Sequence, residues 1–451
     1  KRALNRIFET NDLNYEQINS IAFYERPLTA FLTTLKTAAL NIPRSLPLIV
    51  HQCRNFDKSS ISCFLDISKL YPGLEKKLLY LDHHLSHTLT ALPYSSIQKD
   101  ICSIVIDGFG DRSTSSISKL NNKFDIKELW SCDYPYSLGL YYSAITDFLG
   151  FQINEGEYKV MGLSAFGDSN SNEAKKVSNL IHWDRKNKKI VLDMNYFSFH
   201  VSPTNSYSKK LVDLLGVPRN PFISLYPDDK NFHFYANIAR GAQDAVLRIL
   251  IDIFEFAHSL TGSRIFCFSG GVAMNSAALN KIATLEFVDQ IVIPPSPGDA
   301  GSSIGAAYYA YLKTSSKVVN QIPKPTLFPS IFDSSKQIKL ANKIITKNFI
   351  QITNSIDKTI AKVAELIKEG HVIGFVIKNA ETGPRALGNR SLICDGKNKI
   401  AVKLLNTVIK NRSPFRPTAP CMKYEVAKKY YDLREELIDS YLSMSATCNC
   451  K

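Results

Sequence analysis

The sequence predicts an α/β fold, because apolar runs of strand length end in glycine-containing loops that lead into helical patterns. The clearest runs are Ile101 to Asp107, followed by Gly-Phe-Gly, and Arg264 to Phe268, followed by Ser-Gly-Gly. At 451 residues the chain is too long for one ordinary core, so we expect two or three domains. A Pro-rich stretch, residues 322–330, indicates a linker. It divides the chain into a first domain, residues 1–330, and a second, residues 331–451.

Further elements follow in chain order. Phe232 to His258 carries apolar residues at helical spacing, Val288 to Ile293 is a strand that enters a Pro/Gly loop, and Ala300 to Tyr311 is the next helix. Beyond the linker, Thr359 to Glu369 is an amphipathic helix and Val372 to Ile377 a strand, which begins a second α/β unit. In such folds ligands bind at the carboxyl ends of the strands.

Composition excludes several classes of protein. The apolar content is 45%, and no run approaches the roughly 20 apolar residues of a membrane-spanning helix. The formal charge is +14, but the basic residues are dispersed, so we infer no nucleic-acid groove. The nine cysteines include no CxxC pair, which suits reduced thiols in a cytoplasm. The chain opens at Lys1 rather than at Met, which fits either a fragment of a longer protein or a natural truncation. The sequence also leaves open whether identical chains form a homo-oligomer.

Three of the nine histidines fall within five residues, in the segment Asp-His-His-Leu-Ser-His that begins at Asp82. If the segment is helical, His83 and His87 lie one turn apart on one face, where two imidazoles can bind one cation. Asp299, between glycines on a loop at a strand end, is the best third ligand. His84, on another face, could act as an acid or base. The alternative is that these are surface or capping histidines.

Glycine-rich turns follow several strands, and their backbone amides favour phosphate or the polar edge of a nucleotide. A loop from Asn154 to Leu163 adds charged residues between glycines and apolar side chains. Each feature alone could be an ordinary turn. The residues of interest are Asp107, Gly108, Gly110, Glu157, Lys159, Gly270, Gly271 and Asn275.

Five cations stand in two short Pro-containing loops beyond the linker. They are Arg385, Arg390, Lys410, Arg412 and Arg416. Arginine binds phosphate or carboxylate bidentately, and proline limits the entropy lost in holding it. The loops therefore indicate an anion site, although salt bridges to nearby acidic residues would also account for them.

Six motifs in this order, from about Phe23 to about Tyr430, resemble one known family. The motifs are HHLSHTLTALPYS, YSLGLYYSAITDFLGFQINEGEYKVMGLSAFGD, SGGVAMN, PSPGDAGSSIGAA, GPRALGNRS and FRPTAP. The combination closely resembles the carbamoyltransferases of the NodU/CmcH/TobZ type. The resemblance implies an ASKHA (actin/hexokinase-like) domain followed by a YrdC-like α/β domain, which is incomplete in this chain.

The resemblance also implies an activity. The second domain would turn carbamoyl phosphate and ATP into a carbamoyl-adenylate, and the first would move the carbamoyl group to a hydroxyl of a small molecule such as a sugar, a nodulation factor or an antibiotic. His83, His87 and Asp299 would bind a divalent metal, for which the family resemblance implies iron. The residues listed above for the glycine-rich turns and the charged loop would form the adenylate pocket. The five cations would bind carbamoyl phosphate and ATP. We expect His84 and Lys159 to act in catalysis.

Two alternatives remain open. One is threonylcarbamoyl transfer to tRNA, suggested by the shared first domain and the basic charge, although the arginine-rich second unit argues against it. The other is a truncated nucleotide-binding protein without catalytic activity. The sequence identifies neither the acceptor nor the metal.

Overall fold

The computed structural model describes residues 2–56, 63–94, 101–121, 125–315, 356–376, 383–386, 388–430 and 438–440. The predicted linker, residues 322–330, and the domain boundary at its end lie outside these ranges, so the boundary stays a prediction. The chain divides into two compact units. Unit 1 comprises Lys1–Ile223, Asp228–Lys324 and Tyr424–Lys451, and unit 2 comprises Ser224–Pro227 and Pro325–Lys423.

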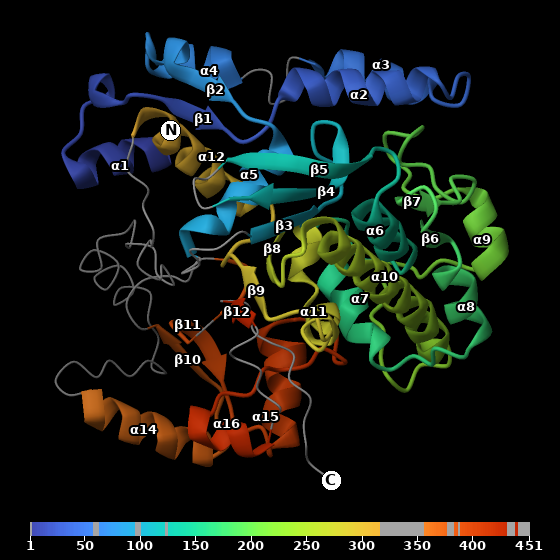
Figure 1. Ribbon diagram of the computed structural model, residues 1–451. Helices are drawn as coiled ribbons and strands as arrows, with labels where there is room; N and C mark the ends of the chain where they lie inside the picture. Colours follow the sequence, from blue (N-terminus) through green and yellow to red (C-terminus); the bar gives the residue numbers. More distant parts are fainter. Residues whose placement is uncertain are drawn as a thin grey trace. The chain divides into compact units, whose positions relative to one another are not determined.

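Unit 1 is built around a six-stranded mixed sheet with the order β12-β9-β8-β3-β4-β5 (Figure 1). β3 pairs in parallel with β8, β8 with β9 and β9 with β12, whereas β3–β4 and β4–β5 are antiparallel. The strands are β3 (Ile101–Ile106), β4 (Ser113–Leu120), β5 (Ile126–Asp133), β8 (Ile265–Ser269), β9 (Gln290–Ile293) and β12 (Ile438–Ser440). Because β3, β8 and β9 run in parallel, their carboxyl ends meet at one edge of the sheet.

Helices cover both faces of this sheet (Figure 1). α5 (His83–Thr90) and α12 (Asp299–Thr314) pack on one face, where Cys267 of β8 belongs to a buried apolar cluster with their side chains. α10 (Phe232–Thr261) packs on the other, where Phe254 contacts Phe266 and Phe268 of β8. The alternation of Phe266, Cys267 and Phe268 matches the period of two of a strand buried on both sides.

Among the described residues of unit 1, the strands outside the six-stranded sheet form two pairs. One is parallel, β1 (Ile21–Phe23) with β2 (Leu78–Tyr80), and the other is antiparallel, β6 (Ile181–Asp184) with β7 (Lys189–Leu192). The other helices are α1 (Arg2–Asn11), α2 (Pro27–Ala39), α3 (Leu46–Arg54), α4 (Cys63–Leu70), α6 (Leu138–Phe148), α7 (Glu157–Ser164), α8 (Asn172–Ser178), α9 (Lys209–Leu215), α11 (Ser276–Ile282) and α16 (Tyr424–Tyr430).

The described part of unit 2 contains an antiparallel strand pair and two helices. β10 (Ile373–Val376) pairs with β11 (Arg390–Ile393). α14 (Ile356–Lys368) precedes the pair, and α15 (Lys399–Leu404) follows it and continues as a π-helical turn to Ile409. The described order in this unit is helix, strand, strand, helix, so it contains both element types without the strict alternation of unit 1's parallel strands. The chain as a whole is a mixed α/β protein.

The predicted elements are confirmed to within a few residues. The strand from Ile101, the long helix from Phe232 and the strand and helix beyond the linker all form. α10 ends at Thr261, and the next residue, Gly262, adopts a left-handed conformation with φ 68°, as glycine often does after a helix. The histidine segment is helical, which was the condition for a metal site.

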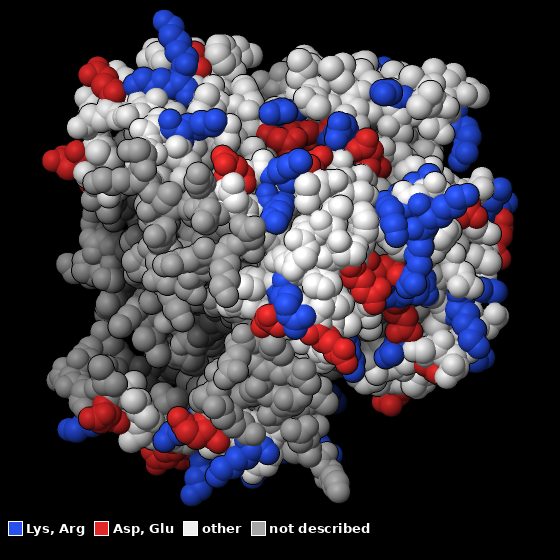
Figure 2. All heavy atoms as spheres, viewed as in Figure 1, with Lys and Arg blue, Asp and Glu red and all other residues white. Residues whose placement is uncertain are grey.

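No helix among the described residues is long and apolar enough to cross a membrane. On the face that Figure 2 shows, lysine and arginine side chains are interspersed with aspartate and glutamate, as the dispersed basic sequence predicts. The seven cysteines in the described part of the chain are all free thiols.

Candidate metal centre

Two histidines of α5 belong to a cluster that could hold a metal ion, the candidate metal centre. The helix begins after Asp82, whose carboxylate accepts the backbone N–H of Leu85 at 3.1 Å, and such a cap fixes the first turn. His83 and His87 are one turn apart, with 2% and 0% of their surfaces exposed. Their Nε2 atoms are 3.1 Å apart, so both rings point at the same spot, as predicted.

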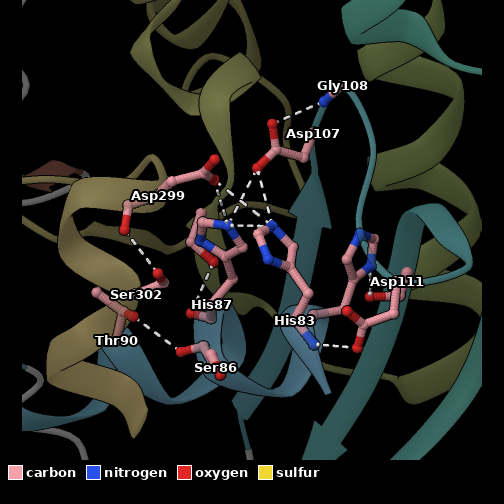
Figure 3. Close-up of polar contacts among 12 residues, drawn as sticks. His83, Ser86, His87, Thr90, Asp107, Gly108, Asp111, Asp299 and Ser302 are labelled. Carbon is pink, nitrogen blue, oxygen red and sulfur yellow. Dashed lines mark hydrogen bonds and ion pairs between the residues drawn. The ribbon is translucent and has the colours of Figure 1, made fainter. Parts of the chain in front are cut away.

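Two carboxylates approach the histidines from the strand ends. Asp107 directly follows β3, and Asp299 is the first residue of α12, after the loop that leaves β9. Figure 3 shows both side chains pointing toward the two imidazoles. The sequence predicted Asp299 as the third ligand. It placed Asp107 in a nucleotide pocket, whereas the structure brings this carboxylate to the histidines.

The four side chains offer one ligand atom each, all within 4.8 Å of one another. The Nε2 of His87 lies 3.0 Å from Asp107 Oδ2 and 3.3 Å from Asp299 Oδ1. The Nε2 of His83 lies 3.7 Å and 3.5 Å from the same oxygens. The Asp107 side chain is 14% exposed and that of Asp299 is 61% exposed, so the cluster is accessible from the Asp299 side.

These separations fit a single ion. Ligand atoms about 2.1 Å from one metal lie roughly 3.0 Å apart at a right angle and about 3.4 Å apart at the tetrahedral angle. Four of the five nitrogen–nitrogen and nitrogen–oxygen distances lie between 3.0 and 3.5 Å. Two imidazoles and two carboxylates suit iron, manganese or zinc, and the two negative charges match a divalent ion.

Electrostatics also favour a cation at this point. Burial lowers the pKa values of His83 and His87, but hydrogen bonds to the two aspartates outweigh it and raise the pKa of His83 to about 10 and that of His87 above its ordinary value. Burial raises the pKa values of Asp107 and Asp299, and contacts with the histidines outweigh it and lower both. Protons thus supply the positive charge that a bound metal would replace.

Close backbone packing fixes the elements that carry the ligands. A Cβ at Gly305 of α12 would lie 1.9 Å from the carbonyl oxygen of Ser86 in α5, so the two helices touch through this glycine. At the strand ends, a Cβ at Gly271 would lie 3.1 Å from Asp107 Oδ1. The Ser269 hydroxyl donates to the carbonyl oxygen of His87 at 2.9 Å. The three strand-end loops therefore converge on the candidate metal centre.

His84, predicted to act as an acid or base, points away from this cluster. It is 3% exposed, and its Nδ1 lies 2.8 Å from the Ser116 hydroxyl on β4. Burial lowers its pKa to about 3, with the charges of His83 and His87 adding to the effect. A neutral, enclosed imidazole suits packing and orientation of α5 more than proton exchange with a substrate, so the catalytic role stays a prediction.

The residues predicted to bind a nucleotide are each held by the protein itself. The amides of Gly108, Gly110 and Gly270 donate to Asp107 Oδ1, Ser113 O and Pro297 O. Hence these three amides are not available as donors. Gly110 and Gly270 also allow close packing, because a Cβ there would lie 2.9 Å and 2.3 Å from the nearest neighbouring atom.

The polar members of the set are engaged in the same way. The Asn275 side chain caps α11 through the amide of Ala278 and pairs with Gln243. Glu157 accepts from the Ser143 hydroxyl and from two backbone amides of its own loop. The ammonium of Lys159 lies 5.6 Å from the centre of the Phe151 ring.

In unit 2 three of the five predicted cations gather. Burial lowers the pKa of Lys410, and the positive charges of Arg412 and Arg416 lower it further. Arg412 Nε donates to Asn406 Oδ1 at 2.8 Å, which fixes the guanidinium. Arg390 opens β11, and Arg385 lies in the turn before it.

Sequence reasoning missed two residues beside the metal centre. Tyr24 lies with its ring centre 5.6 Å from that of His83, and Asp111 accepts the backbone N–H of His83. Tyr24 carried no signal, because it is far from the histidines in sequence. Asp107 and Asp111 share one turn after a buried strand, and that pairing of acidic residues could have been read as a ligand-bearing loop.

Comparison with known proteins identifies the family. Residues 49–308 match the carbamoyltransferase N-terminus, and residues 364–451 match the carbamoyltransferase C-terminus. The chain belongs to the carbamoyltransferase family of enzymes. The predicted family resemblance is thereby confirmed.

Several curated relatives are similar to this carbamoyltransferase chain. An uncharacterized protein of Synechocystis is 28% identical over 94% of the chain and 71% of its own length. Nodulation protein NolNO of Sinorhizobium fredii is 28% identical over 83% of the chain and 53% of its own length. Nodulation protein NolO of Bradyrhizobium diazoefficiens is 28% identical over 78% of the chain and 60% of its own length. The chain thus spans little more than half the length of these two nodulation proteins.

Two solved structures of HypF are also similar in part. The HypF of T. kodakarensis is 14% identical with a TM-score of 0.29, over 55% of this chain and 38% of that one. Full-length HypF in the phosphate- and nucleotide-bound form is 14% identical with a TM-score of 0.30, over 56% of this chain and 46% of that one. Likeness at this level supports neither a shared fold nor a shared ligand.

Proposed function

We propose that this carbamoyltransferase moves a carbamoyl group from carbamoyl phosphate, through an ATP-derived carbamoyl-adenylate, to a hydroxyl of a small molecule. The observation that carries the proposal is the convergence of His83, His87, Asp107 and Asp299 on one point at the strand ends in a chain that belongs to this family. The chain's own residues would hold a divalent ion, for which we propose iron.

A bound ion would act as a Lewis acid on the carbamoyl oxygen. The residues around it have separate tasks. His83 and His87 present their Nε2 atoms from a capped helix. The carboxylate of Asp107, on the buried side of the cluster, would balance the positive charge of the ion. Asp299 stands on the exposed side, where the reacting groups would enter. Its free carboxylate oxygen is the group we propose to receive the proton of the acceptor hydroxyl.

We propose that the turns around Gly271 and Asn275 line the adenylate pocket and that Lys159 contacts its phosphate. Gly271 supports this placement because it lies against Asp107, so a ligand over that turn would reach the metal centre. Glu157 is better suited to holding its own loop, since its carboxylate already accepts three hydrogen bonds.

In unit 2, we propose that Lys410, Arg412 and Arg416 bind the phosphate groups of carbamoyl phosphate and ATP, with contributions from Arg385, in the segment before β11, and from Arg390, the first residue of β11. A phosphate among the first three would relieve the repulsion that lowers the pKa of Lys410. The assignment of ASKHA and YrdC-like folds to the two halves, and a place in the cytoplasm, are parts of the same proposal.

The experiment uses the full-length protein, loaded with Fe(II), with ATP, radiolabelled carbamoyl phosphate and a panel of hydroxylated acceptors. We expect release of pyrophosphate and incorporation of label into at least one acceptor. His87→Ala should abolish label incorporation while leaving pyrophosphate release intact, because the adenylate would form elsewhere. A protein that binds metal and nucleotide yet releases no pyrophosphate and labels nothing would contradict the proposal and favour a binding protein without catalysis.

A further inference from the structure

Asp111 is a buried carboxylate that joins two distant segments. It is 2% exposed. Its Oδ1 accepts the backbone N–H of Arg26 at 2.8 Å, and its Oδ2 accepts the backbone N–H of His83 at 3.0 Å. Figure 3 shows the second contact beside the metal centre. One side chain thus ties the start of α2 to the start of α5.

Asp111 adds to the capping of α5 from outside the helix. Asp82 accepts the amide of Leu85, whereas Asp111 accepts the amide of His83, another first-turn N–H group that has no partner within the helix. Asp111 stands in the loop that joins β3 to β4 and also carries Asp107. Between the two, a Cβ at Gly110 would lie 2.9 Å from the His84 ring and 3.2 Å from the His83 ring. A single short loop therefore supplies one metal ligand and fixes the helix that supplies two others.

The other partner of Asp111 leads to an aromatic side chain. Arg26 is two residues after Tyr24, whose ring lies against that of His83 with the centres 5.6 Å apart and the planes at 55°. Phe23 anchors the same segment in β1, where it pairs with Tyr80. When Asp111 holds the amide of Arg26, it also holds Tyr24 against the imidazole.

We infer that Asp111 is a positioning residue of the metal centre, which fixes His83 between Asp107 and Tyr24 by binding the backbones of His83 and Arg26 together. The inference rests on the proposed function only in that the centre binds a metal. Hydrogen-bonded partners behind metal ligands commonly change metal affinity by about 10- to 100-fold when they are removed.

The substitution Asp111→Asn tests the inference with little change in shape. Either orientation of the amide turns one NH₂ toward a backbone N–H, so one of the two contacts is lost. We expect Co(II) to bind about 10- to 100-fold more weakly, with a changed d–d absorption spectrum, because His83 no longer has a fixed direction. Tyr24→Leu should change the spectrum as well, with a weaker effect on affinity.

Asp184→Asn is the control for loss of a carboxylate that holds backbone amides. Oδ1 of Asp184 accepts the backbone N–H groups of Lys186 and Asn187, and its Oδ2 accepts the side-chain amide of Asn187, at the turn between β6 and β7. Asp184→Asn should leave the affinity for Co(II) and the absorption spectrum as in the wild type, even if it lowers the denaturation midpoint of the metal-free chain as much as Asp111→Asn does.

Co(II) titration of the full chain and its variants, followed by absorption, decides the question. In the double variant of Asp111 and Tyr24, the loss of affinity should be smaller than the product of the single losses, because both act through His83. Wild-type affinity and spectrum in Asp111→Asn would overturn the inference and leave the proposed function standing. If Asp111→Asn does not fold, an unchanged spectrum in Tyr24→Leu overturns the inference. A wild-type chain that binds no Co(II) overturns both the inference and the metal centre.

Discussion

Substitution of Gly305 by alanine should damage the metal centre from a distance. Gly305 lies in α12, against the backbone of α5, and bears no ligand. An added Cβ would stand 1.9 Å from Ser86 O and 2.8 Å from the amide nitrogen of Thr90. Both of these are backbone atoms of α5, so neither can rotate away as the end of a side chain could.

The size of the effect follows from these distances. A Cβ–oxygen contact needs at least about 3 Å, so the two helices must part by roughly 1 Å at this point. Asp299 is in the first turn of α12, and its Oδ1 lies 3.3 Å from His87 Nε2. Metal–ligand distances tolerate only about ±0.2 Å, so a shift of this size removes Asp299 from the coordination shell. We expect about 100-fold weaker Co(II) binding.

The same substitution separates packing from helix propensity. Alanine in a helix interior is better than glycine by about 1 kcal/mol, whereas overpacking costs about 1–3 kcal/mol. We therefore expect Gly305→Ala to lower the stability of the metal-free chain in chemical denaturation, although alanine forms helices more readily than glycine. Ser303→Ala, at an exposed position of the same helix, should change neither property. Wild-type Co(II) affinity in Gly305→Ala would refute the reasoning, since it would mean that α12 does not hold Asp299 in place.

Three further predictions concern other parts of the chain. Asp107→Asn should weaken Co(II) binding more than Asp111→Asn does, because it removes a ligand rather than a support; equal effects in calorimetric titrations would speak against Asp107 as a ligand. Arg412→Gln should weaken binding of carbamoyl phosphate and ATP by about tenfold or more, the value of one charge-assisted contact, and leave Co(II) binding unchanged; Lys397→Gln, exposed in the same unit, serves as the control in equilibrium dialysis. Burial and the charge of Arg44 lower the pKa of His200 to about 4, below the value of about 6.5 in an unfolded chain. The unfolded state therefore binds the extra proton between these values, so the unfolding free energy should fall as the pH drops from about 6.5 toward about 4. His200→Asn should lack this part of the decline in denaturation at pH 7 and pH 4.5, and an identical decline in both proteins would contradict the assignment.

The sequence predicted most of the fold near the metal centre. The apolar runs before Asp107 and after Thr261 are of strand length and lead into glycine-containing loops, so both strands and their ends could be predicted from the sequence. The pairing of His83 and His87 needed only helical spacing. Asp299 was predicted because it lies between glycines after a strand.

What the sequence did not show depends on contacts between distant segments. Asp107 was placed with the nucleotide because its neighbouring glycines suggested a phosphate loop, yet those amides are occupied by nearby acceptors. Asp111 and Tyr24 meet His83 only after β1, α5 and the β3–β4 loop pack together. The burial of His84 against Ser116 likewise depends on α5 lying over β4, which no local pattern indicates.

Anomalous diffraction from a crystal of the Co(II)-loaded chain, measured at the cobalt edge, tests the metal centre most directly. We expect one strong peak per chain, within about 2.3 Å of the Nε2 atoms of His83 and His87 and of one oxygen each from Asp107 and Asp299. A peak at other residues, or a loaded chain whose two histidines and two aspartates contact no metal, would contradict the account.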